Sequence, residues 1–339
     1  MNSAKKKNVF AVCDTEMEYA YNFMEYLNQK KNIPFEVHAF TSPEVLADFA
    51  KNNEIEILLI SDKAMRDEIR TLPIHQIVIL SEGVHSPSLD QYPAVYKYQS
   101  SDAVIREVMA CYGARSGVSP ILSVIPKKEM RVIGIYSPVG RTQKTSFALT
   151  LGQILSRDRA VLYLNMESHS GFEQLLECKY DKGLSDILYY ARQENKNIIY
   201  KMGSMIQSMQ NLDYLPPAAS PMDIQTATYE EWIWLLEEIE KNSNYEVLIL
   251  DIGDGVAQLY QILDHCTELY IPVRSDVVSM AKITQFESLL KTWDCQSVLA
   301  KMRKIHVPFH TTNRTGKAYF EELVWSELGD FVRQLLRGS

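Results

Sequence analysis

Short apolar runs alternate with amphipathic stretches along the N-terminal third of the chain. The runs are rich in β-branched residues, which is typical of buried strands. Between the first two runs, Tyr19, Phe23 and Leu27 recur at helical spacing. Strands that alternate with helices predict a parallel sheet covered on both faces. The predicted strands lie within residues 8–14, 34–40, 54–62, 74–83 and 94–99, and the predicted helices within 18–30, 42–52 and 101–112.

The same alternation restarts at residue 131. Before it, the segment GARSGVSPILSVIPKKEM mixes Gly, Ser, Pro and Lys, which is typical of a linker. We therefore predict an α/β protein with a first domain over 1–112, a linker over 113–130 and a second domain over 131–339. In the second domain, the predicted strands lie within 131–137, 160–167, 211–217, 245–255, 269–273 and 304–309, and the main helices within 145–156, 230–243 and 319–336.

Composition and charge narrow the class of protein. The 35 Lys and Arg against 43 Asp and Glu give a formal net charge of −8, which argues against a general electrostatic grip on nucleic acid. No apolar run approaches the roughly 18 residues of a membrane-spanning helix, so no membrane insertion is expected. The five cysteines are scattered without CxxC spacing, so neither a disulfide framework nor a zinc site is expected. These features predict a cytoplasmic location.

The loop after the strand at 131–137 has features of a phosphate-binding site. Such a site combines a strand, consecutive backbone N–H groups, a lysine and a helix N-terminus. Lys144 could reach the β- and γ-phosphates, while Thr145 and Asp251, which ends the buried run VLILD, could bind Mg²⁺. The standard glycine pattern is absent, because Pro138 and Gln143 replace its two glycines. We predict ATP and Mg²⁺ as cofactors, bound through Val139, Gly140, Arg141, Thr142, Gln143, Lys144, Thr145 and Ser146.

Four segments carry a resemblance to a known family: RVIGIYSPVGRTQKTSFALTLGQIL, AVLYLNMESHSGF, NLDYLPPAASPMDI and YEVLILDIGDGV. They resemble the ParA/MinD group of P-loop ATPases. The chain looks most like the TadZ/CpaE branch, which joins an atypical receiver domain to a ParA-like ATPase. This resemblance covers essentially the whole chain. It implies a receiver-like (flavodoxin-like) parallel sheet for residues 1–112, and a ParA/MinD-like P-loop NTPase sheet with helices on both faces for residues 131–339.

The family motif KGGxGKT, matched backwards from Thr145, shows what this chain keeps and what it lacks. The family's additional lysine, which reaches the partner's phosphates in an ATP-sandwich dimer, falls on Val139. The family's glycines fall on Gly140, Arg141 and Gln143. Arg141 is then either a solvated loop residue or a cation that substitutes for the missing lysine.

The acids of the family match only in part. Its paired acids fall on Asn165 and Glu167. The resemblance implies that Glu167 positions the attacking water and that Asn165 is a weakened metal-shell residue, unless both simply end a polar strand. Asp251 matches the Walker B acid, so Glu167 and Asp251 are the implied catalytic residues. By the same analogy, Pro272 and the strand end IPVRSD would line the base pocket.

The departures from the family motif affect the expected rate of ATP hydrolysis. Asp254 stands where the family has a small residue, and a negative charge near phosphates weakens γ-phosphate binding unless it faces away. Phosphoryl transfer depends mainly on positioning and charge stabilisation. Losing one cation and one acid while gaining another acid therefore costs more in turnover than in affinity. We predict ATP binding with weak or negligible hydrolysis.

The first domain lacks the acceptor of a working receiver. Asp14 and Glu16 follow the first strand, and Lys97 follows the fifth, as a receiver requires. Ser61 stands at the phosphoacceptor position, with Asp62 one residue later. A one-residue slip turns a side chain to the other face of a strand, so Asp62 is a poor substitute. We predict a pseudo-receiver used for dimerisation or for docking to a partner.

Three function classes remain open. The resemblance implies an ATP-binding localisation or assembly factor that dimerises with nucleotide and recruits the tight-adherence (Flp-type) pilus secretion machinery to one place in the cell, such as a cell pole. The second class is a nucleotide-free interaction scaffold with two degenerate domains. The third is an active partitioning-type ATPase, which the negative charge, the acidic last helix and the altered loop disfavour. Nucleotide affinity separates the second class from the others, and turnover separates the first from the third.

Overall fold

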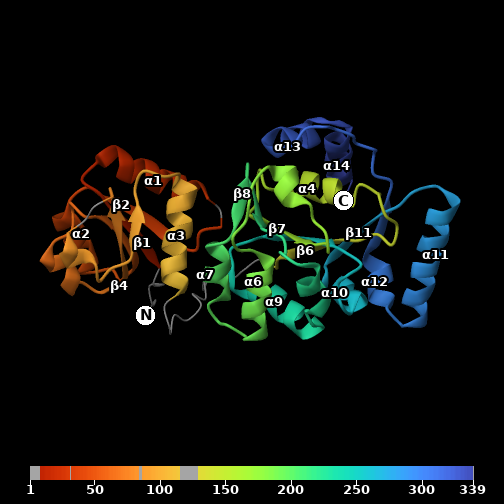
Figure 1. Ribbon diagram of the computed structural model, residues 1–339, viewed down its shortest axis with the longest axis horizontal. Helices are drawn as coiled ribbons and strands as arrows, with labels where there is room; N and C mark the ends of the chain where they lie inside the picture. Colours follow the sequence, from red (N-terminus) through yellow and green to blue (C-terminus); the bar gives the residue numbers. More distant parts are fainter. Residues whose placement is uncertain (1–7, 31, 84–85, 115–128, 339) are drawn as a thin grey trace, which may run out of the picture. The chain divides into compact units, whose positions relative to one another are not determined.

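The computed structural model of the protein describes residues 8–30, 32–83, 86–114 and 129–338. Its backbone contacts divide the chain into two compact units, each built on one sheet (Figure 1). The first unit holds the described part of Met1–Pro126 with Lys196–Ser204 and Asn242–Asn244, and the second unit holds the remainder. Both sheets are mainly parallel and carry helices on both faces. The predicted α/β class is confirmed.

Five parallel strands form the first sheet, in the order β2-β1-β3-β4-β5. This is the order of a doubly wound, flavodoxin-like sheet. Phe10 and Val12 of β1 enter a core with α1 and α3, while Val9, Ala11 and Cys13 enter the core on the α2 face. The elements are β1 (Val9–Cys13), α1 (Met17–Gln29), β2 (Glu36–Phe40), α2 (Pro43–Ala50), β3 (Ile55–Ser61), η1 (Asp67–Thr71), β4 (Ile74–Ser81), η2 (Pro87–Leu89), β5 (Ala94–Tyr96) and α3 (Ser101–Gly113).

A short helix from far along the chain, α7 (Ile198–Gly203), completes the core of the first unit. The Tyr200 ring meets the Tyr112 ring of α3 edge to face, with ring centroids 4.9 Å apart. Tyr200 is 4% exposed and belongs to the core that α1 and α3 share. A Cβ added at Gly113 would lie 3.2 Å from the Tyr200 Cβ, so glycine permits this close approach. Nothing in the local sequence pattern at 198–203 indicates this contact.

Replacing Tyr200 with alanine is expected to destabilise the first unit by about 3 kcal/mol, because it leaves a cavity against Tyr112. Hydrogen exchange of peptides from β1 and α3 should accelerate in this variant. Tyr189→Ala is the matched control, since Tyr189 is 59% exposed. Unchanged exchange in Tyr200→Ala would show that α7 is not part of this core.

Seven strands form the second sheet, in the order β12-β11-β6-β10-β7-β9-β8, and only β8 runs antiparallel to its neighbour. Asp251 of β10 pairs in register with Ile135 of β6 and Asn165 of β7. The carboxyl ends of these central strands therefore meet at one edge, where open α/β sheets bind ligands. The strands are β6 (Arg131–Ile135), β7 (Val161–Met166), β8 (Gln207–Met209), β9 (Leu212–Leu215), β10 (Val247–Ile252), β11 (Glu268–Pro272) and β12 (Met302–Ile305).

Helices cover both faces of the second sheet (Figure 1). Phe147, Phe320 and Val332 bring α4, α13 and α14 into one core on one face. On the other face lies α9, with Trp232 and Leu235 buried. None of the described helices combines the length and apolar character needed to cross a membrane. The helices are α4 (Lys144–Leu155), α5 (Phe172–Leu176), α6 (Leu184–Arg192), α8 (Pro221–Thr226), α9 (Tyr229–Asn242), α10 (Leu259–His265), α11 (Val277–Thr292), α12 (Gln296–Lys301), α13 (Gly316–Trp325) and α14 (Glu327–Arg337).

Two predicted element boundaries are wrong. The strand predicted over 304–309 is β12, which covers Met302–Ile305 at the edge of the sheet. An edge strand tolerates polar residues, and Arg303 and Lys304 are exposed. The single helix predicted over 319–336 is two helices, because Ser326 Oγ accepts from the Leu328 N–H over 3.2 Å and caps a new one.

Most of the linker predicted over 113–130 lies outside the described residues, which exclude 115–128. Of its described ends, Gly113 closes α3 and Met130 is buried next to β6. The exact boundaries of the two domains stay a prediction.

Candidate nucleotide-binding site

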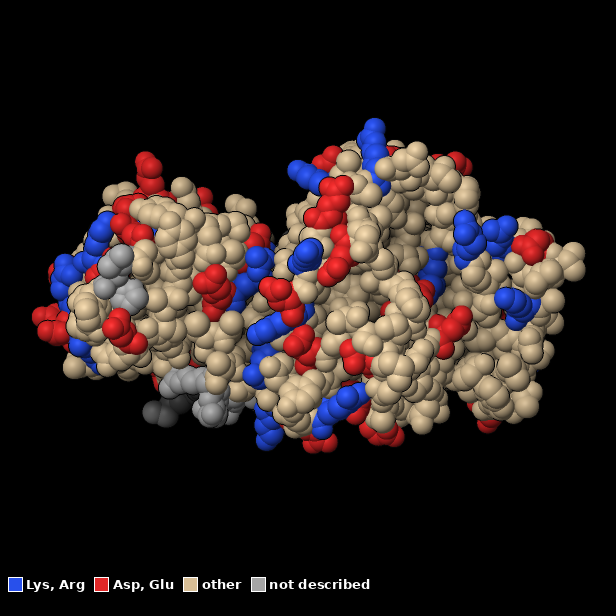
Figure 2. Space-filling model, viewed as in Figure 1, with Lys and Arg blue, Asp and Glu red and all other residues tan. Residues whose placement is uncertain are grey.

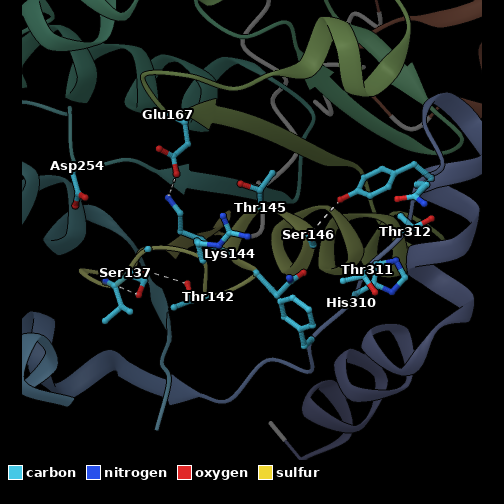
Figure 3. Close-up of a pocket in the computed structure, with 17 residues that line it drawn as sticks. Ser137, Thr142, Lys144, Thr145, Ser146, Glu167, Asp254, His310, Thr311 and Thr312 are labelled. Atoms are coloured by element: carbon cyan, nitrogen blue, oxygen red, sulfur yellow. Dashed lines mark hydrogen bonds and ion pairs between the residues drawn. The ribbon is translucent and has the colours of Figure 1, made fainter. Parts of the chain in front are cut away.

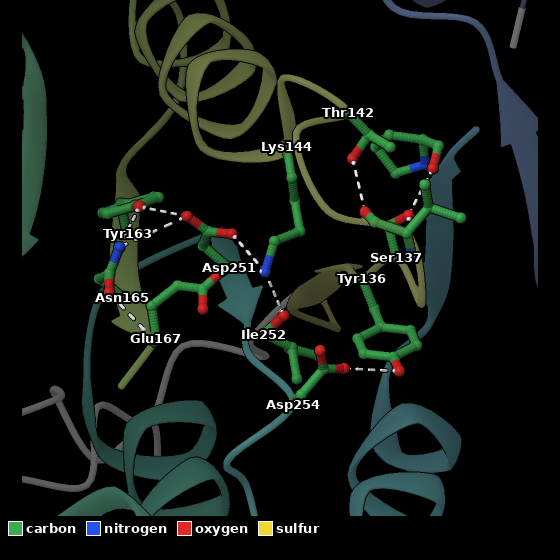
Figure 4. Close-up of polar contacts among 12 residues, drawn as sticks. Tyr136, Ser137, Thr142, Lys144, Tyr163, Asn165, Glu167, Asp251, Ile252 and Asp254 are labelled. Atoms are coloured by element: carbon green, nitrogen blue, oxygen red, sulfur yellow. Dashed lines mark hydrogen bonds and ion pairs between the residues drawn. The ribbon is translucent and has the colours of Figure 1, made fainter. Parts of the chain in front are cut away.

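The loop between β6 and α4 has the backbone of a glycine-rich loop although two of the expected glycines are replaced. Arg141 has φ 61° and Gln143 has φ 63°, both in the left-handed region that glycine adopts readily. These are two of the positions where the resemblance expects glycine. Ser137 braces the loop, because its Oγ donates to the Pro272 carbonyl over 2.6 Å and accepts from the Val139 N–H over 3.1 Å (Figure 4).

Replacing Gln143 with glycine is expected to raise the stability of the second unit by about 0.5–1 kcal/mol. A left-handed non-glycine residue costs about 1–2 kcal/mol, and the added freedom of the unfolded chain cancels part of the gain. Thermal unfolding followed by tryptophan fluorescence reports on this unit, because all four tryptophans follow residue 131. Gln143→Ala is the control, since it keeps Cβ and should gain nothing. Equal stability of the two variants would show that the loop is unstrained.

A cavity of about 660 Å³ lies over this loop, within the size range of small-molecule sites (Figure 3). All eight residues predicted to bind the cofactor line it, as do Glu167 and Asp254. Asp251 is fully buried and is not among the lining residues. The remaining wall consists of residues after β12 and from α13, namely Phe309, His310, Thr311, Thr312, Asn313 and Tyr319.

Lys144, the first residue of α4, is held at the carboxyl edge of the sheet by acids. Its Nζ lies 2.5 Å from Glu167 Oε1 and 3.3 Å from Asp251 Oδ1, and it donates to the Ile252 carbonyl (Figure 4). Burial alone would lower the pKa of Lys144, but Asp251 and Glu167 raise it overall. A charged ammonium therefore lies at a helix N-terminus, which is an anion-binding arrangement.

Asp251 is oriented by two side chains of β7. Tyr163 OH donates to Asp251 Oδ2 over 2.9 Å, and Asn165 Nδ2 lies 3.4 Å from the same oxygen (Figure 4). Burial, and then the Asp251 charge, raise the pKa of Tyr163 well above its usual value, so this hydroxyl stays a donor. Asn165 thus orients the Walker-B-type carboxylate directly. Within the part of the chain that the structure describes, the other oxygen, Asp251 Oδ1, accepts no hydrogen bond, and it faces Lys144 Nζ at 3.3 Å.

Two more acids line the cavity. The Glu167 N–H donates to Asn165 Oδ1 over 3.1 Å, which fixes the start of the segment after β7. Asp254 Oδ1 accepts from Tyr136 OH over 2.9 Å (Figure 4). Burial, and then Asp254, raise the pKa of Tyr136 above its usual value. At Gly253 an added Cβ would lie 2.7 Å from Glu167 Oε2, so glycine keeps the two acidic segments close. Asp254 lines the cavity, so its charge opposes a γ-phosphate there.

The site fits a nucleotide phosphate chain, and a Mg²⁺ ion that arrives with it. Lys144, the α4 N-terminus and the cavity volume suit the phosphates. Thr145 lines the cavity, and Asp251 Oδ1 is a buried acceptor without a hydrogen bond. Among the described residues no cluster of three or more His, Cys, Asp or Glu could hold a metal. Mg²⁺ commonly takes one or two side chains and completes its shell with water and substrate phosphates. Bound there, the ion would neutralise phosphate charge.

Sequence patterns did not indicate the wall after β12. Pro272 was expected in a base pocket, but its carbonyl braces Ser137, and the segment IPVRSD is absent from the described cavity lining. The run FHTTN takes that place, followed by Tyr319, whose OH lies 3.1 Å from Ser146 Oγ. The sequence did offer one signal for this wall. An aromatic residue is followed by hydroxyl and amide side chains, between a predicted strand and a predicted helix.

In the first unit, Lys97 fills the site where a receiver would take a phosphoryl group. Its side chain is fully buried, with Nζ 2.8 Å from Asp14 Oδ2, 3.1 Å from Glu16 Oε1 and 3.7 Å from Glu82 Oε1. Burial alone would lower the pKa of Lys97, but hydrogen bonds to Asp14 and Glu16 raise it overall. One internal cation therefore lies among three acids of the site.

No carboxylate from the end of β3 enters this site. Ser61 is buried at the acceptor position, and its Oγ has no hydrogen-bond partner among the described residues. Asp62 Oδ1 instead accepts from the Lys63 N–H over 2.7 Å. This geometry supports the predicted pseudo-receiver.

Comparison with known proteins finds one matching family model and several similar solved structures. Residues 6–113 match the family model described as TadZ-like, receiver domain. No curated protein matches the chain. A ParA family ATPase from Chlorobium tepidum TLS is 21% identical, with a TM-score of 0.45, over 57% of this chain and 81% of that chain. A plasmid partition protein from Borrelia burgdorferi is 15% identical, with a TM-score of 0.43, over 62% of this chain and all of that chain. A putative plasmid partition protein (BB_S35) from Borrelia burgdorferi B31, bound to AMPPNP, is 19% identical, with a TM-score of 0.42, over 59% of this chain and 82% of that chain.

The protein is thus an α/β protein with two sheets. The first has the strand order of a receiver, and the second carries a loop with the backbone of a phosphate-binding loop. Residues 6–113, which form most of the first unit, are similar to the TadZ-like receiver domain. The predicted receiver domain of the TadZ-like kind is confirmed by this match for residues 6–113.

Proposed function

We propose that this protein is a nucleotide-controlled assembly factor of the TadZ/CpaE kind. It binds ATP, forms a homodimer that ATP stabilises, and recruits the tight-adherence (Flp-type) pilus secretion machinery in the cytoplasm, at a cell pole. The observation that carries the proposal is the presence, in one chain, of a TadZ-like receiver domain and of Lys144 at a helix N-terminus behind a left-handed loop. The predicted absence of a nucleic-acid partner rests on the net charge of −8.

Weak hydrolysis follows from the charges around the phosphate site. Asn165 provides no carboxylate, and Glu167 is paired with Lys144. Asp254 adds negative charge to the cavity lining. The position of the family's additional lysine is Val139, which is 6% exposed. A site with these charges holds phosphates better than it stabilises their transfer.

Dimerisation has two supports in the second unit. Arg141 is exposed at the rim of the cavity, where it can meet phosphates held by a second copy. Val277, Val278 and Met280 are 86%, 67% and 44% exposed at the start of α11, which follows β11 at the same sheet edge. Exposed apolar groups beside a ligand site favour a protein contact there.

The test is calorimetry with Mg-ATP, together with sedimentation velocity with and without ATP. We expect micromolar binding, about −8 kcal/mol at 1 μM, and a shift towards dimer with ATP. Turnover should lie below about 0.01 per second, the rate of a GTPase with its own arginine finger. Binding with fast turnover would favour a partitioning-type ATPase.

One observation favours the scaffold alternative. The Lys144 charge is already balanced by Glu167, Asp251 and the Ile252 carbonyl. A nucleotide has to compete with these partners. If ATP does not bind at millimolar concentration, the proposed nucleotide-controlled assembly factor is wrong and the nucleotide-free scaffold is favoured.

A further inference from the structure

The wall of the cavity opposite the phosphate loop is held by one carboxylate. Glu322 of α13 accepts from Thr312 Oγ1 over 2.9 Å and lies 3.3 Å from Arg314 Nε through the same oxygen, Oε2. Its other oxygen, Oε1, lies 3.6 Å from His310 Nε2. Three side chains of one irregular segment therefore converge on Glu322, which is 28% exposed.

This segment has no regular secondary structure to fix it. Residues 306–315 form neither helix nor strand between β12 and α13. Apart from the contacts with Glu322, the described residues give it one internal bond, from the Arg314 N–H to Thr312 Oγ1 over 3.1 Å, and one outward bond, from Thr315 to Glu177. The conformation of the wall therefore depends on Glu322 more than on backbone pairing.

The wall carries chemistry suited to a planar base. Phe309 is 68% exposed and offers a ring for stacking. Thr311 (Figure 3) and Asn313 line the same cavity and offer hydroxyl and amide groups. The cations and the helix N-terminus belong to the opposite side, at Lys144. Phosphate binding and base recognition thus fall on different elements.

We infer that Glu322 is a positioning residue that sets base selectivity by holding the segment Phe309–Asn313, independently of the phosphate loop. This inference rests on the proposed nucleotide binding. Glu322 contacts no phosphate-loop residue among the contacts of the described chain, so it acts on the wall alone. Its loss should weaken binding of a nucleotide but not of a bare phosphate chain.

The experiment compares Glu322→Gln with Glu321→Gln by calorimetry against Mg-ATP, Mg-GTP and Mg-tripolyphosphate. Glu321 is the adjacent residue and is 50% exposed, with only a long ion pair to Lys317 at 3.8 Å. We expect Glu322→Gln to weaken ATP about tenfold and to reduce the ATP-to-GTP preference, with tripolyphosphate unchanged. Glu321→Gln should match the wild type. Thr312→Val, which keeps the shape and the carboxylate, should lie between them.

Equal weakening of ATP and tripolyphosphate by Glu322→Gln would show a general structural role and overturn the inference. So would wild-type affinity for ATP and an unchanged ATP-to-GTP preference in that variant. Both results leave the proposed function standing, because the wild type still binds ATP. Failure of the wild type to bind either ATP or tripolyphosphate would instead overturn the proposed function. Tryptophan-detected melting of each variant identifies any that does not fold.

Discussion

Replacing Lys144 with alanine is expected to abolish measurable ATP binding, with an affinity loss of at least about 100-fold. The lysine contributes charged hydrogen bonds to phosphate, each worth about 1.5–3 kcal/mol, and about 1.4 kcal/mol corresponds to a factor of ten. Substitution also leaves Glu167 and Asp251 without their cation, so the cavity becomes negative and repels phosphates. Calorimetry with Mg-ATP measures the loss directly.

Lys182→Ala is the matched control, because Lys182 is exposed and does not line the cavity. It removes the same charge from the second unit and should leave ATP affinity unchanged. Tryptophan-detected melting should show that Lys144→Ala remains folded, since Tyr163 and Asn165 still donate to Asp251. Retained ATP binding in a folded Lys144→Ala protein would exclude the β6–α4 loop as the phosphate site.

Replacing Lys97 with alanine is expected to destabilise the first unit by about 3 kcal/mol. Removing one partner of a buried ion pair leaves an uncompensated charge, which costs about 3–5 kcal/mol. Here Asp14 is 1% exposed, whereas Glu16 is half-exposed and stays partly solvated, so the lower value applies. Hydrogen exchange of peptides from β1 and β3 should accelerate, and this unit can be followed separately because the method resolves peptides.

Lys63→Ala serves as the control for Lys97→Ala. Lys63 is 55% exposed and forms an ion pair with Glu82 over 2.8 Å, and a surface pair of this kind contributes at most about 1 kcal/mol. Exchange in Lys63→Ala should stay close to that of the wild type. Equal effects of the two substitutions on hydrogen exchange would show that Lys97 is not the central cation among Asp14, Glu16 and Glu82.

The alternation of apolar runs predicted both sheets, because strands buried on two faces are read directly from short β-branched segments. It failed at β12, because an edge strand tolerates polar residues. It also missed the break at Ser326, because the apolar spacing continues across this local helix cap. The predicted loop residues lie around one cavity because Lys144 and Thr145 open α4 directly after a strand. The sequence also predicted Asp251 at this edge, because it lies near the end of the buried run that forms β10.

By itself, the sequence determined the two α/β sheets, the candidate phosphate loop and the serine that replaces a receiver's acceptor, because each depends on spacing along a few neighbouring residues. Only the tertiary structure decided that Tyr200 completes the core of the first unit and that Tyr163 orients Asp251. It also decided that the segment Phe309–Asn313 lines the cavity and that its Thr312 donates to Glu322. The physical reason is that these contacts join residues far apart in the chain, and side-chain packing and burial, which no local periodicity encodes, select them.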